Sequence, residues 1–256
     1  MKGKENWQIF IPTRGRVHDQ ETWKWIPTDM RDRTYALLHK EEEKQWKERY
    51  PDLQYLVHPK SDIGGIRQWL MEQGNTPHLV LDDDLKFYRR KAIGDWHLRY
   101  CASSDMRDLF TMLWKQPQAL VGVAARQGHN REPENSRLIG RQMQLHGYDP
   151  RVWQDLEIKC DRVKLMEDFD IILQLLRAGK QNYISYEWAI GQRASNMPGG
   201  CSLYRTNEAQ TVAAQKLAKL HPGFVKVVEK ENKNWKGFEK RTDVIVYWKK
   251  AYESSL

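Results

Sequence analysis

A strand, a helix and a second strand follow one another between residues 54 and 81, and this order limits the folds open to the chain. The segment QYLVHP is rich in β-forming residues. The next segment places Ile63, Ile66 and Leu70 on one helical face and ends at Gly74, which can adopt the left-handed conformation. The apolar run HLVL then predicts a strand. This order is typical of a parallel crossover, and therefore of an α/β sheet.

The rest of the chain also predicts both strands and helices. We expect strands at Trp7–Pro12, at Ala119–Ala125, in NYISYEWAI and in DVIVYWKK. We expect helices in SDMRDLFTMLWKQ with Ser104 as N-cap, from Glu167 to Gly179, and at Asn207–Leu220. The segment TRGRV after the first strand should turn at Gly15. The chain has no internal repeat. Since 256 residues suit one large α/β domain, we expect one domain over residues 1–256, with a basic extension at about 226–256.

Composition favours a folded protein with an anionic partner. Hydrophobic residues make up 40% of the 256 residues, which is enough for a packed core. The formal net charge is +8 and the sequence pI is about 9.3. A basic balance of this kind favours nucleic acid, a nucleotide or a membrane surface as a partner, although many basic proteins bind no nucleic acid.

Cysteine content and the N-terminal segment predict a reducing compartment. The three cysteines are odd in number, and no pair has metal-ligand spacing. They indicate reduced thiols and not a disulfide framework. The N-terminal residues contain no apolar leader, and no run approaches the length that crosses a bilayer. We therefore expect a cytoplasmic protein that does not bind a membrane.

Three consecutive carboxylates, Asp82, Asp83 and Asp84, follow the apolar run HLVL directly. In an open parallel sheet, ligands bind beyond the carboxyl ends of the strands. Alternation along an extended chain would place Asp82 and Asp84 on one side. Two hard oxygen donors on one side suit Mg²⁺ or Mn²⁺ carrying a diphosphate. The alternative is a solvated acidic turn with no binding role.

This strand followed by Asp-x-Asp resembles the metal and nucleotide-sugar motif of GT-A fold glycosyltransferases. The segments IPTRGRV, DIGGIRQWLMEQGNTPHLVLDDDL, LMEDFDIILQLLRAGK and KLHPGFVKV follow in the order of that fold, over about Trp7–Val228. The resemblance implies an α/β, GT-A (Rossmann-like) three-layer sandwich with a mostly parallel mixed sheet. With PGGCS added, the motifs most resemble the phage glycosyltransferases of hydroxymethylated pyrimidines in DNA, which are related to the base J glucosyltransferase.

The resemblance implies roles for particular residues. The residues that would bind the nucleotide sugar are Pro12, Thr13, Arg14, Arg16, Arg67, Asp82, Asp83, Gly199 and Gly200. The metal ligands would be Asp82, Asp84 and His221. Asp168, or else Glu167, would take a proton from the acceptor hydroxyl. Each residue also has a structural reading: a helix start for the two acids, surface charge for Arg14 and Arg16, packing for His221, and a plain turn for the glycines.

The resemblance implies metal-dependent transfer of a sugar from a UDP-sugar to the hydroxymethyl group of 5-hydroxymethylcytosine or 5-hydroxymethyluracil. UDP-glucose is the expected donor. The partner would be double-stranded phage DNA in the host cytoplasm. The candidate DNA-facing segments are Gln127–Arg137 and Lys226–Arg241, with Trp96, His97, Arg99 and Tyr100 available either to contact the acceptor strand or to pack.

Three other functions remain open from the residues alone. The same fold could act on a glycan or a protein acceptor. A carboxylate-bound metal could instead support phosphoryl transfer or cleavage of nucleic acid. The chain could also be a basic nucleic-acid-binding module without catalysis, in which the three aspartates bind nothing.

Overall fold

The structure is a computed structural model that describes residues 7–92, 95–126, 132–192, 199–231 and 240–256. The strands are β1 (Gln8–Pro12), β2 (Thr34–Leu38), β3 (Gln54–Val57), β4 (His78–Leu81), β5 (Lys86–Arg90), β6 (Leu98–Tyr100), β7 (Leu120–Ala125), β8 (Ser136–Leu138), β9 (Leu145–Tyr148), β10 (Tyr183–Gly191), β11 (Val225–Glu231) and β12 (Lys240–Val246). The α-helices are α1 (Glu43–Arg49), α2 (Ile63–Glu72), α3 (Ser103–Lys115), α5 (Pro150–Asp155), α6 (Glu167–Arg177), α7 (Asn207–Leu220) and α8 (Trp248–Glu253). A 3₁₀ helix, η2 (Thr22–Trp25), lies between β1 and β2.

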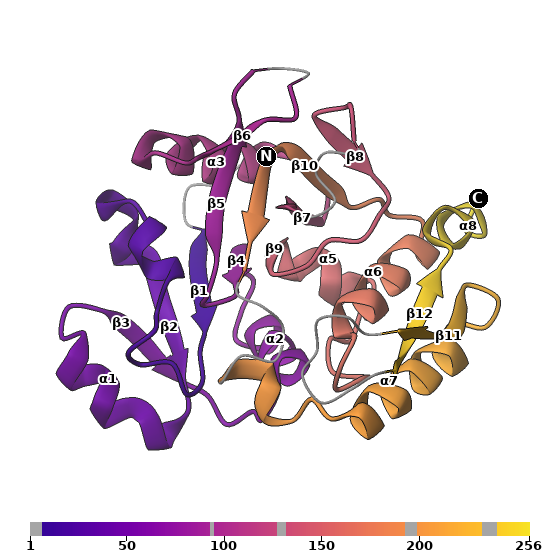
Figure 1. Ribbon diagram of the computed structural model, residues 1–256, viewed down its shortest axis with the longest axis horizontal. Helices are drawn as coiled ribbons and strands as arrows, with labels where there is room; N and C mark the ends of the chain where they lie inside the picture. Colours follow the sequence, from indigo (N-terminus) through magenta and orange to yellow (C-terminus); the bar gives the residue numbers. More distant parts are fainter. Residues whose placement is uncertain (1–6, 93–94, 127–131, 193–198, 232–239) are drawn as a thin grey trace.

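The main sheet has the strand order β3-β2-β1-β4-β9-β7-β10-β5-β6, with β8 paired to β10. Strands β1 to β4 are parallel neighbours, and β7 is parallel to β10. Strands β5, β8 and β9 run against their neighbours. The described part of the chain therefore contains the mixed, mostly parallel sheet that the sequence predicts (Figure 1).

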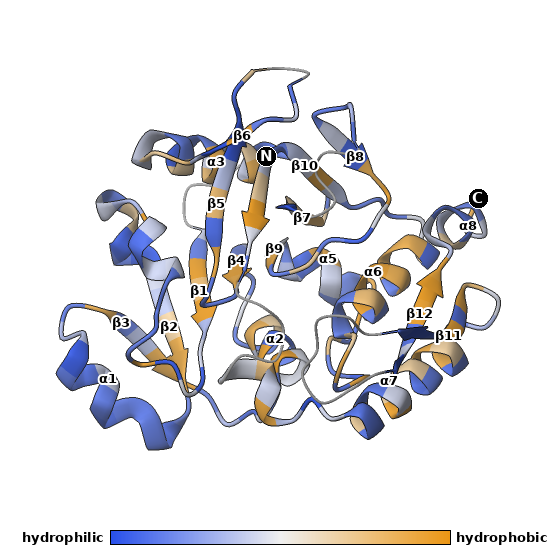
Figure 2. Cartoon of the chain, viewed as in Figure 1, coloured by the Kyte–Doolittle hydropathy of each residue, from blue (hydrophilic) through white to orange (hydrophobic). Residues whose placement is uncertain are grey.

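Apolar residues on both faces of the sheet make this a three-layer fold. On β1, Phe10 packs into one core cluster with α2, α5, α6 and α7, whereas Ile9 and Ile11 pack into the other with α3. The same alternation occurs on β4, where Val80 belongs to the first cluster and its neighbours to the second. Figure 2 shows the contrast between these apolar strands and the largely hydrophilic α1. Period-two alternation with both faces buried is what a sheet covered by helices requires.

Several predicted elements are confirmed, and one predicted cap is wrong. Strands β1, β4, β7 and β10 and helices α2, α6 and α7 occur where the sequence predicts them. Helix α3 starts at Ser103 with Ala102 as N-cap, and not at Ser104, because the Asp105 carboxylate accepts the Ala102 backbone N–H at 2.7 Å. Gly15 has φ +67°, as the predicted turn demands. The sequence prediction omitted β2, β5, β6, β8, β9, β11, α1, α5 and α8.

The segment after residue 220 packs against the body of the fold. In Figure 1 the β11–β12 hairpin lies between α7 and α8. Thr211 on α7 shares a hydrogen bond of 2.7 Å with Thr242 on β12. Trp248 on α8 stacks on Phe169 of α6, with ring centroids 5.7 Å apart. The hairpin therefore approaches the N-terminal end of α6, where Glu167 and Asp168 lie. None of the described helices combines the length and apolar character that a membrane span needs.

Candidate active site

A cavity of about 310 Å³ opens beyond the carboxyl end of β4. The first aspartate of the triplet lines it, together with a buried arginine and the two acids that begin α6. The lining residues used below are Arg67, Asp82, Arg141, Gln144, Met166, Glu167, Asp168, Gln192, Cys201, Arg205, Gln210, Arg241 and Asp243. The structure thus brings Asp82 together with Arg67, Glu167 and Asp168, four of the residues that the sequence predicts for the site.

The aspartate triplet forms a turn and not an extended strand. The prediction that Asp82 and Asp84 point to one side assumed an extended chain, so it is wrong. Thr22 closes the turn: its hydroxyl donates to the Asp82 carbonyl at 2.6 Å and accepts the Leu85 N–H at 2.9 Å. The Asp83 carbonyl also accepts the backbone N–H groups of Glu21 and Thr22. As a result Asp82 alone of the three lines the cavity.

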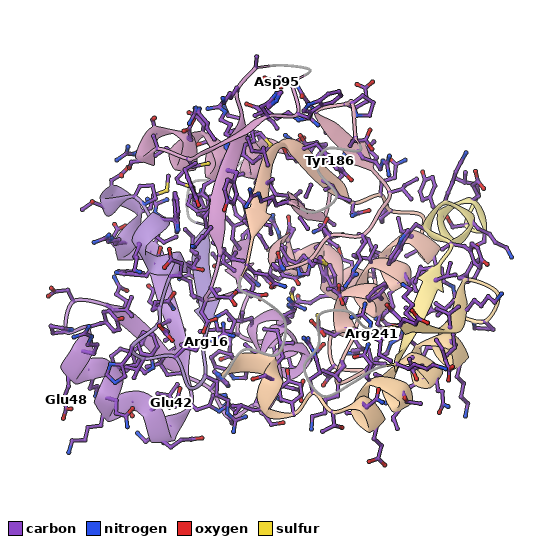
Figure 3. All side chains as sticks on the ribbon, in the orientation of Figure 1. Arg16, Glu42, Glu48, Asp95, Tyr186 and Arg241 are labelled. Atoms are coloured by element: carbon purple, nitrogen blue, oxygen red, sulfur yellow. The ribbon has the colours of Figure 1, made fainter. Side chains whose placement is uncertain are left out.

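The other two aspartates face the loop after β1. The Thr13 hydroxyl donates to Asp83 at 2.6 Å, and Arg16 Nη1 lies 2.5 Å from Asp83 Oδ1 and 3.0 Å from Asp84 Oδ2. Burial raises the pKa of Asp83, against the opposing effects of Arg16 and Thr13. Arg16, which we predicted to contact a diphosphate, is therefore paired with the acidic turn. Figure 3 shows Arg16 to the left of Arg241, which lies on β12.

Gly199 and Gly200 pack against this same loop. The Gly200 N–H donates to the carbonyl of Arg14 at 2.9 Å. Gly199 has φ +90°, and a Cβ atom there would come within 2.7 Å of Arg16 Cγ and 2.9 Å of the Arg14 carbonyl. Glycine at 199 therefore lets the two chain segments approach closely. Arg14 itself donates to the carbonyl of Ser61 at 3.3 Å, and Pro12 ends β1 beside Leu37.

The half-buried Asp82 carboxyl is held in an unfavourable electrostatic environment. Burial raises its pKa to about 8, and repulsion from Asp84 adds to the shift, while Arg67 opposes it. Arg67 donates to Glu167 at 2.6 Å and is only 2% exposed. Burial favours neutral arginine, but Tyr148, Glu167 and Asp82 outweigh it and hold the pKa of Arg67 above its usual value. Arg67 thus offsets the charge of two acids that line the cavity.

The two acids at the start of α6 have different surroundings. Burial raises the pKa of Glu167, whereas its ion pair with Arg67 opposes that rise. Asp168 Oδ2 accepts Arg141 Nε at 3.1 Å and Nη2 at 3.0 Å, and Oδ1 has no hydrogen-bond partner within the described residues. Helix α6 starts directly from Met166, which has φ +61°, and this left-handed residue turns both acids toward the cavity.

The structure does not bring His221 to the aspartates, which corrects its predicted place. It is fully buried at the end of α7 and does not line the cavity. Its Nε2 donates to Asp170 Oδ1 at 2.7 Å, and Arg177 Nη1 donates to its Nδ1 at 3.2 Å. Arg162 completes the cluster with a 2.5 Å contact to Asp170. Both ring nitrogens are therefore used in a structural network.

Of the carboxylates of the acidic turn, Asp82 faces the cavity and Asp84 is paired with Arg16, so the described residues do not form a complete metal site. Within the described ranges, no three His, Cys, Asp or Glu side chains group as a metal site would require. Burial raises the pKa of Asp82 first, and repulsion from Asp84 adds to the shift. A cation held by the acidic turn would offset that repulsion. Mg²⁺ and Mn²⁺ commonly take one or two carboxylates and complete their shell with water and phosphate oxygens.

Sequence reasoning missed most of the far wall of the cavity. Arg205, Gln210, Arg241 and Asp243 come from α7, the turn before it and β12. Asp243 accepts Lys230 Nζ at 3.0 Å and Arg241 Nη2 at 3.1 Å. Their distance along the chain from the aspartates leaves no local signal. Of the predicted DNA-facing segments Gln127–Arg137 and Lys226–Arg241, residues 127–131 and 232–239 lie outside the described residues, and Arg241, the last residue of the second segment, lines the cavity. Trp96 and Tyr100 are 62% and 59% exposed on the β5–β6 side.

Three of the solved structures that are similar to the chain are distant from it in sequence. Mannose-1-phosphate geranyltransferase from Thermus thermophilus is 15% identical, over 59% of each chain, with TM-score 0.36. GalNAc-T7, solved with UDP, GalNAc and Mn²⁺, is 10% identical over 73% of this chain and 43% of its own, with TM-score 0.45. A putative glucose-1-phosphate thymidylyltransferase from Bacillus anthracis, solved with a sucrose, is 10% identical over 59% of this chain and 74% of its own, with TM-score 0.33. The chain thus spans less than two thirds of the first two proteins.

No curated protein sequence is a significant match to the chain. The sequence model of the TET-associated glycosyltransferases, in contrast, matches residues 7–200. That range runs from the start of β1 through α2, the acidic turn and α6 to Gly199 and Gly200. It therefore includes the residues of the loop after β1 and the acids that line the cavity. The chain belongs to the TET-associated glycosyltransferase family.

Proposed function

We propose that this glycosyltransferase moves a sugar from a UDP-sugar, with UDP-glucose as the first candidate, to the hydroxymethyl group of 5-hydroxymethylcytosine or 5-hydroxymethyluracil in DNA. The observation that carries the proposal is the shared cavity of Asp82, Arg67, Glu167 and Asp168. An acid beside a potential cation site and an acid suited to proton transfer, in one cavity, are what sugar transfer to a hydroxyl needs.

Asp168 is the residue that we assign as the base. Its Oδ1 has no hydrogen bond from the described residues, while Arg141 holds Oδ2 and fixes the orientation of the carboxylate. As the acceptor oxygen attacks the anomeric carbon, its proton passes to Asp168 Oδ1. The bond between that carbon and the diphosphate oxygen breaks, and UDP leaves with the electron pair. Glu167, paired with Arg67, is assigned to orient that arginine.

Asp82, which lines the cavity, and Asp84, once released from Arg16, would hold a Mn²⁺ or Mg²⁺ ion, which when bound would neutralise charge on the diphosphate. Thr13 and Arg16 hold the acidic turn from the other side, and Gly199 lets the loop after β1 stay close to it. We assign Arg14, Arg16 and the end of β1 to the nucleotide, because they border the carboxyl end of the sheet.

A DNA acceptor is favoured by the charge of the chain and of the cavity wall. The formal net charge of +8 favours phosphate binding. Arg205, in the turn before α7, and Arg241, on β12, line the same wall of the cavity. A hydroxymethyl group on a pyrimidine lies in the major groove, so the enzyme must reach into that groove or extrude the nucleotide.

The test is release of UDP from a panel of UDP-sugars, with Mn²⁺ or EDTA, and with duplexes that contain hydroxymethylcytosine, hydroxymethyluracil or unmodified bases. The proposal expects metal-dependent release that rises sharply with a modified duplex. Release that ignores every duplex would point to a glycan or protein acceptor. DNA cleavage with Mg²⁺ and without a sugar nucleotide, or DNA binding with no response to UDP-sugars, would overturn the proposed reaction.

A further inference from the structure

The side chain of Gln144 is in an unusual environment at the cavity. It is 7% exposed, yet its Oε1 is buried without a hydrogen-bond partner. Its amide makes no hydrogen bond with any residue in the described part of the chain. A buried amide without a partner is costly, and native proteins rarely retain one unless something else satisfies it.

The backbone at Gln144 is also strained. Its φ is +69°, in the left-handed region that residues other than glycine, asparagine and aspartate seldom adopt. Met166, the residue before Glu167, has φ +61° and lines the same cavity. Strain of this kind persists where the surrounding structure imposes it, and it concentrates at functional sites. Two independent costs, strain and an unpaired amide, therefore coincide at Gln144.

Gln144 is connected directly to the acidic turn. Its backbone carbonyl accepts the Asp82 N–H at 2.8 Å, which places the two residues side by side at the cavity. The neighbouring Gln142 differs: its Oε1 accepts Asn182 Nδ2 at 2.9 Å, and although its Nε2 is unpaired, it does not line the cavity. The combination of a strained backbone, an unpaired oxygen and a place in the cavity therefore belongs to Gln144.

We propose that the Gln144 amide binds a hydroxyl group of the sugar that is transferred, and so helps to select the donor; this inference rests on the proposed function. A sugar hydroxyl both donates and accepts, as an amide does, and a 180° turn of the amide exchanges its oxygen and nitrogen. A site that must satisfy a buried polar group discriminates strongly against ligands that lack the matching group.

The test compares thermal unfolding of the wild type, Gln144→Leu and the matched control Gln142→Leu. Each is measured without ligand, with UDP, and with UDP-glucose, UDP-galactose or UDP-N-acetylglucosamine, all with Mn²⁺. Gln144→Leu removes the unpaired amide, so its ligand-free Tm should rise by about 2–4 °C. The rise in Tm that UDP causes should be the same in the variant and the wild type. The affinity of the variant for the preferred UDP-sugar should fall about 3-fold to 10-fold.

The control should show the opposite pattern. Gln142→Leu removes the hydrogen bond from Asn182, so its Tm should fall while its UDP-sugar affinity stays at the wild-type value. Gln144→Asn, which keeps an amide and tolerates the left-handed backbone, should fold and retain part of the sugar response. In steady-state assays of Gln144→Leu, KM for the donor should rise and KM for DNA should not.

The inference is overturned if Gln144→Leu binds the UDP-sugar as tightly as the wild type, or if only KM for DNA rises. A lower ligand-free Tm for Gln144→Leu would also overturn it, because the amide would then have a structural partner. If no UDP-sugar stabilises the wild type beyond UDP, the proposed function itself fails, and that result is visible in the wild type alone.

Discussion

Replacing Asp170 by asparagine tests the placement of His221 in a structural cluster. Asp170 is fully buried and accepts hydrogen bonds from Arg162 at 2.5 and 3.0 Å, from His221 at 2.7 Å and from Gln174 at 3.0 Å. Asparagine would replace one acceptor oxygen with an amide N–H₂ group, which would then face the donor groups of Arg162, His221 or Gln174. It would also leave the guanidinium of Arg162 without its counter-charge.

The magnitude follows from the burial of this ion pair. Removing one partner of a fully buried pair costs about 3–5 kcal/mol. The Arg162 side chain is 30% exposed, so water would solvate part of the charge left behind and the cost should lie near the lower end of that range. In a chain of this size, about 1 kcal/mol corresponds to 2–4 °C in Tm, so Asp170→Asn should lower Tm by about 6–12 °C at pH 7. Calorimetry or circular dichroism, with UDP binding as a check on the fold, measures the effect.

The effect should depend on pH in a defined direction. Burial raises the pKa of Asp170, but hydrogen bonds from His221 and Arg162 outweigh it and hold the pKa below its usual value. An acid with a depressed pKa contributes its stability above the unfolded value, about 3.9, and loses it as pH falls through the folded pKa. The difference in Tm between wild type and variant should therefore shrink below about pH 4.

Two results would refute this reasoning. A fall in Tm of less than about 2 °C at pH 7 would mean that the cluster contributes little to stability. An increase in the Mn²⁺ concentration needed for donor binding in His221→Gln, with Tm unchanged, would mean that His221 binds metal and is not structural. The conservative variant Arg162→Lys serves as a control, since it keeps a positive charge beside Asp170.

Four further predictions concern the active site and the sheet edge. Asp168→Asn should lower kcat about 10²-fold to 10⁴-fold with little change in Tm, and an unchanged pre-steady-state rate would exclude it as the base. Asp84→Ala should abolish transfer while circular dichroism stays native; full activity would remove the metal assignment. Gly199→Ala should raise KM for the donor, because its Cβ would meet Arg16 and the Arg14 carbonyl, and a wild-type KM would contradict this close packing. Asp105→Asn should lower Tm by several degrees, because Asp105 joins Arg89 and Arg99 and closes the start of α3, and a Tm indistinguishable from that of the wild type would disprove that role.

Part of this structure could be predicted from local sequence alone. The apolar runs of β1, β4, β7 and β10 and the helical stripe of α6 each bury residues at the spacing of their own element, so the pattern is visible without knowing the neighbours. The acidic turn was likewise expected at a strand end, because three adjacent carboxylates do not suit a buried strand. These features predicted the α/β fold and singled out Asp82, whereas the resemblance to GT-A glycosyltransferases pointed to Glu167 and Asp168; all three line the cavity.

Only the tertiary structure decided the rest. Strand β9 has four residues and no clear β pattern; it inserts between β4 and β7, and Gly147 fits there because a Cβ would lie 2.6 Å from Val121 and 2.7 Å from Leu79. Gln144 reaches the cavity through that insertion. Arg241 arrives from a distant part of the chain, and His221 joins Asp170 instead of the aspartates. Pairings between distant segments depend on how the whole chain packs, and local periodicity carries no information about them.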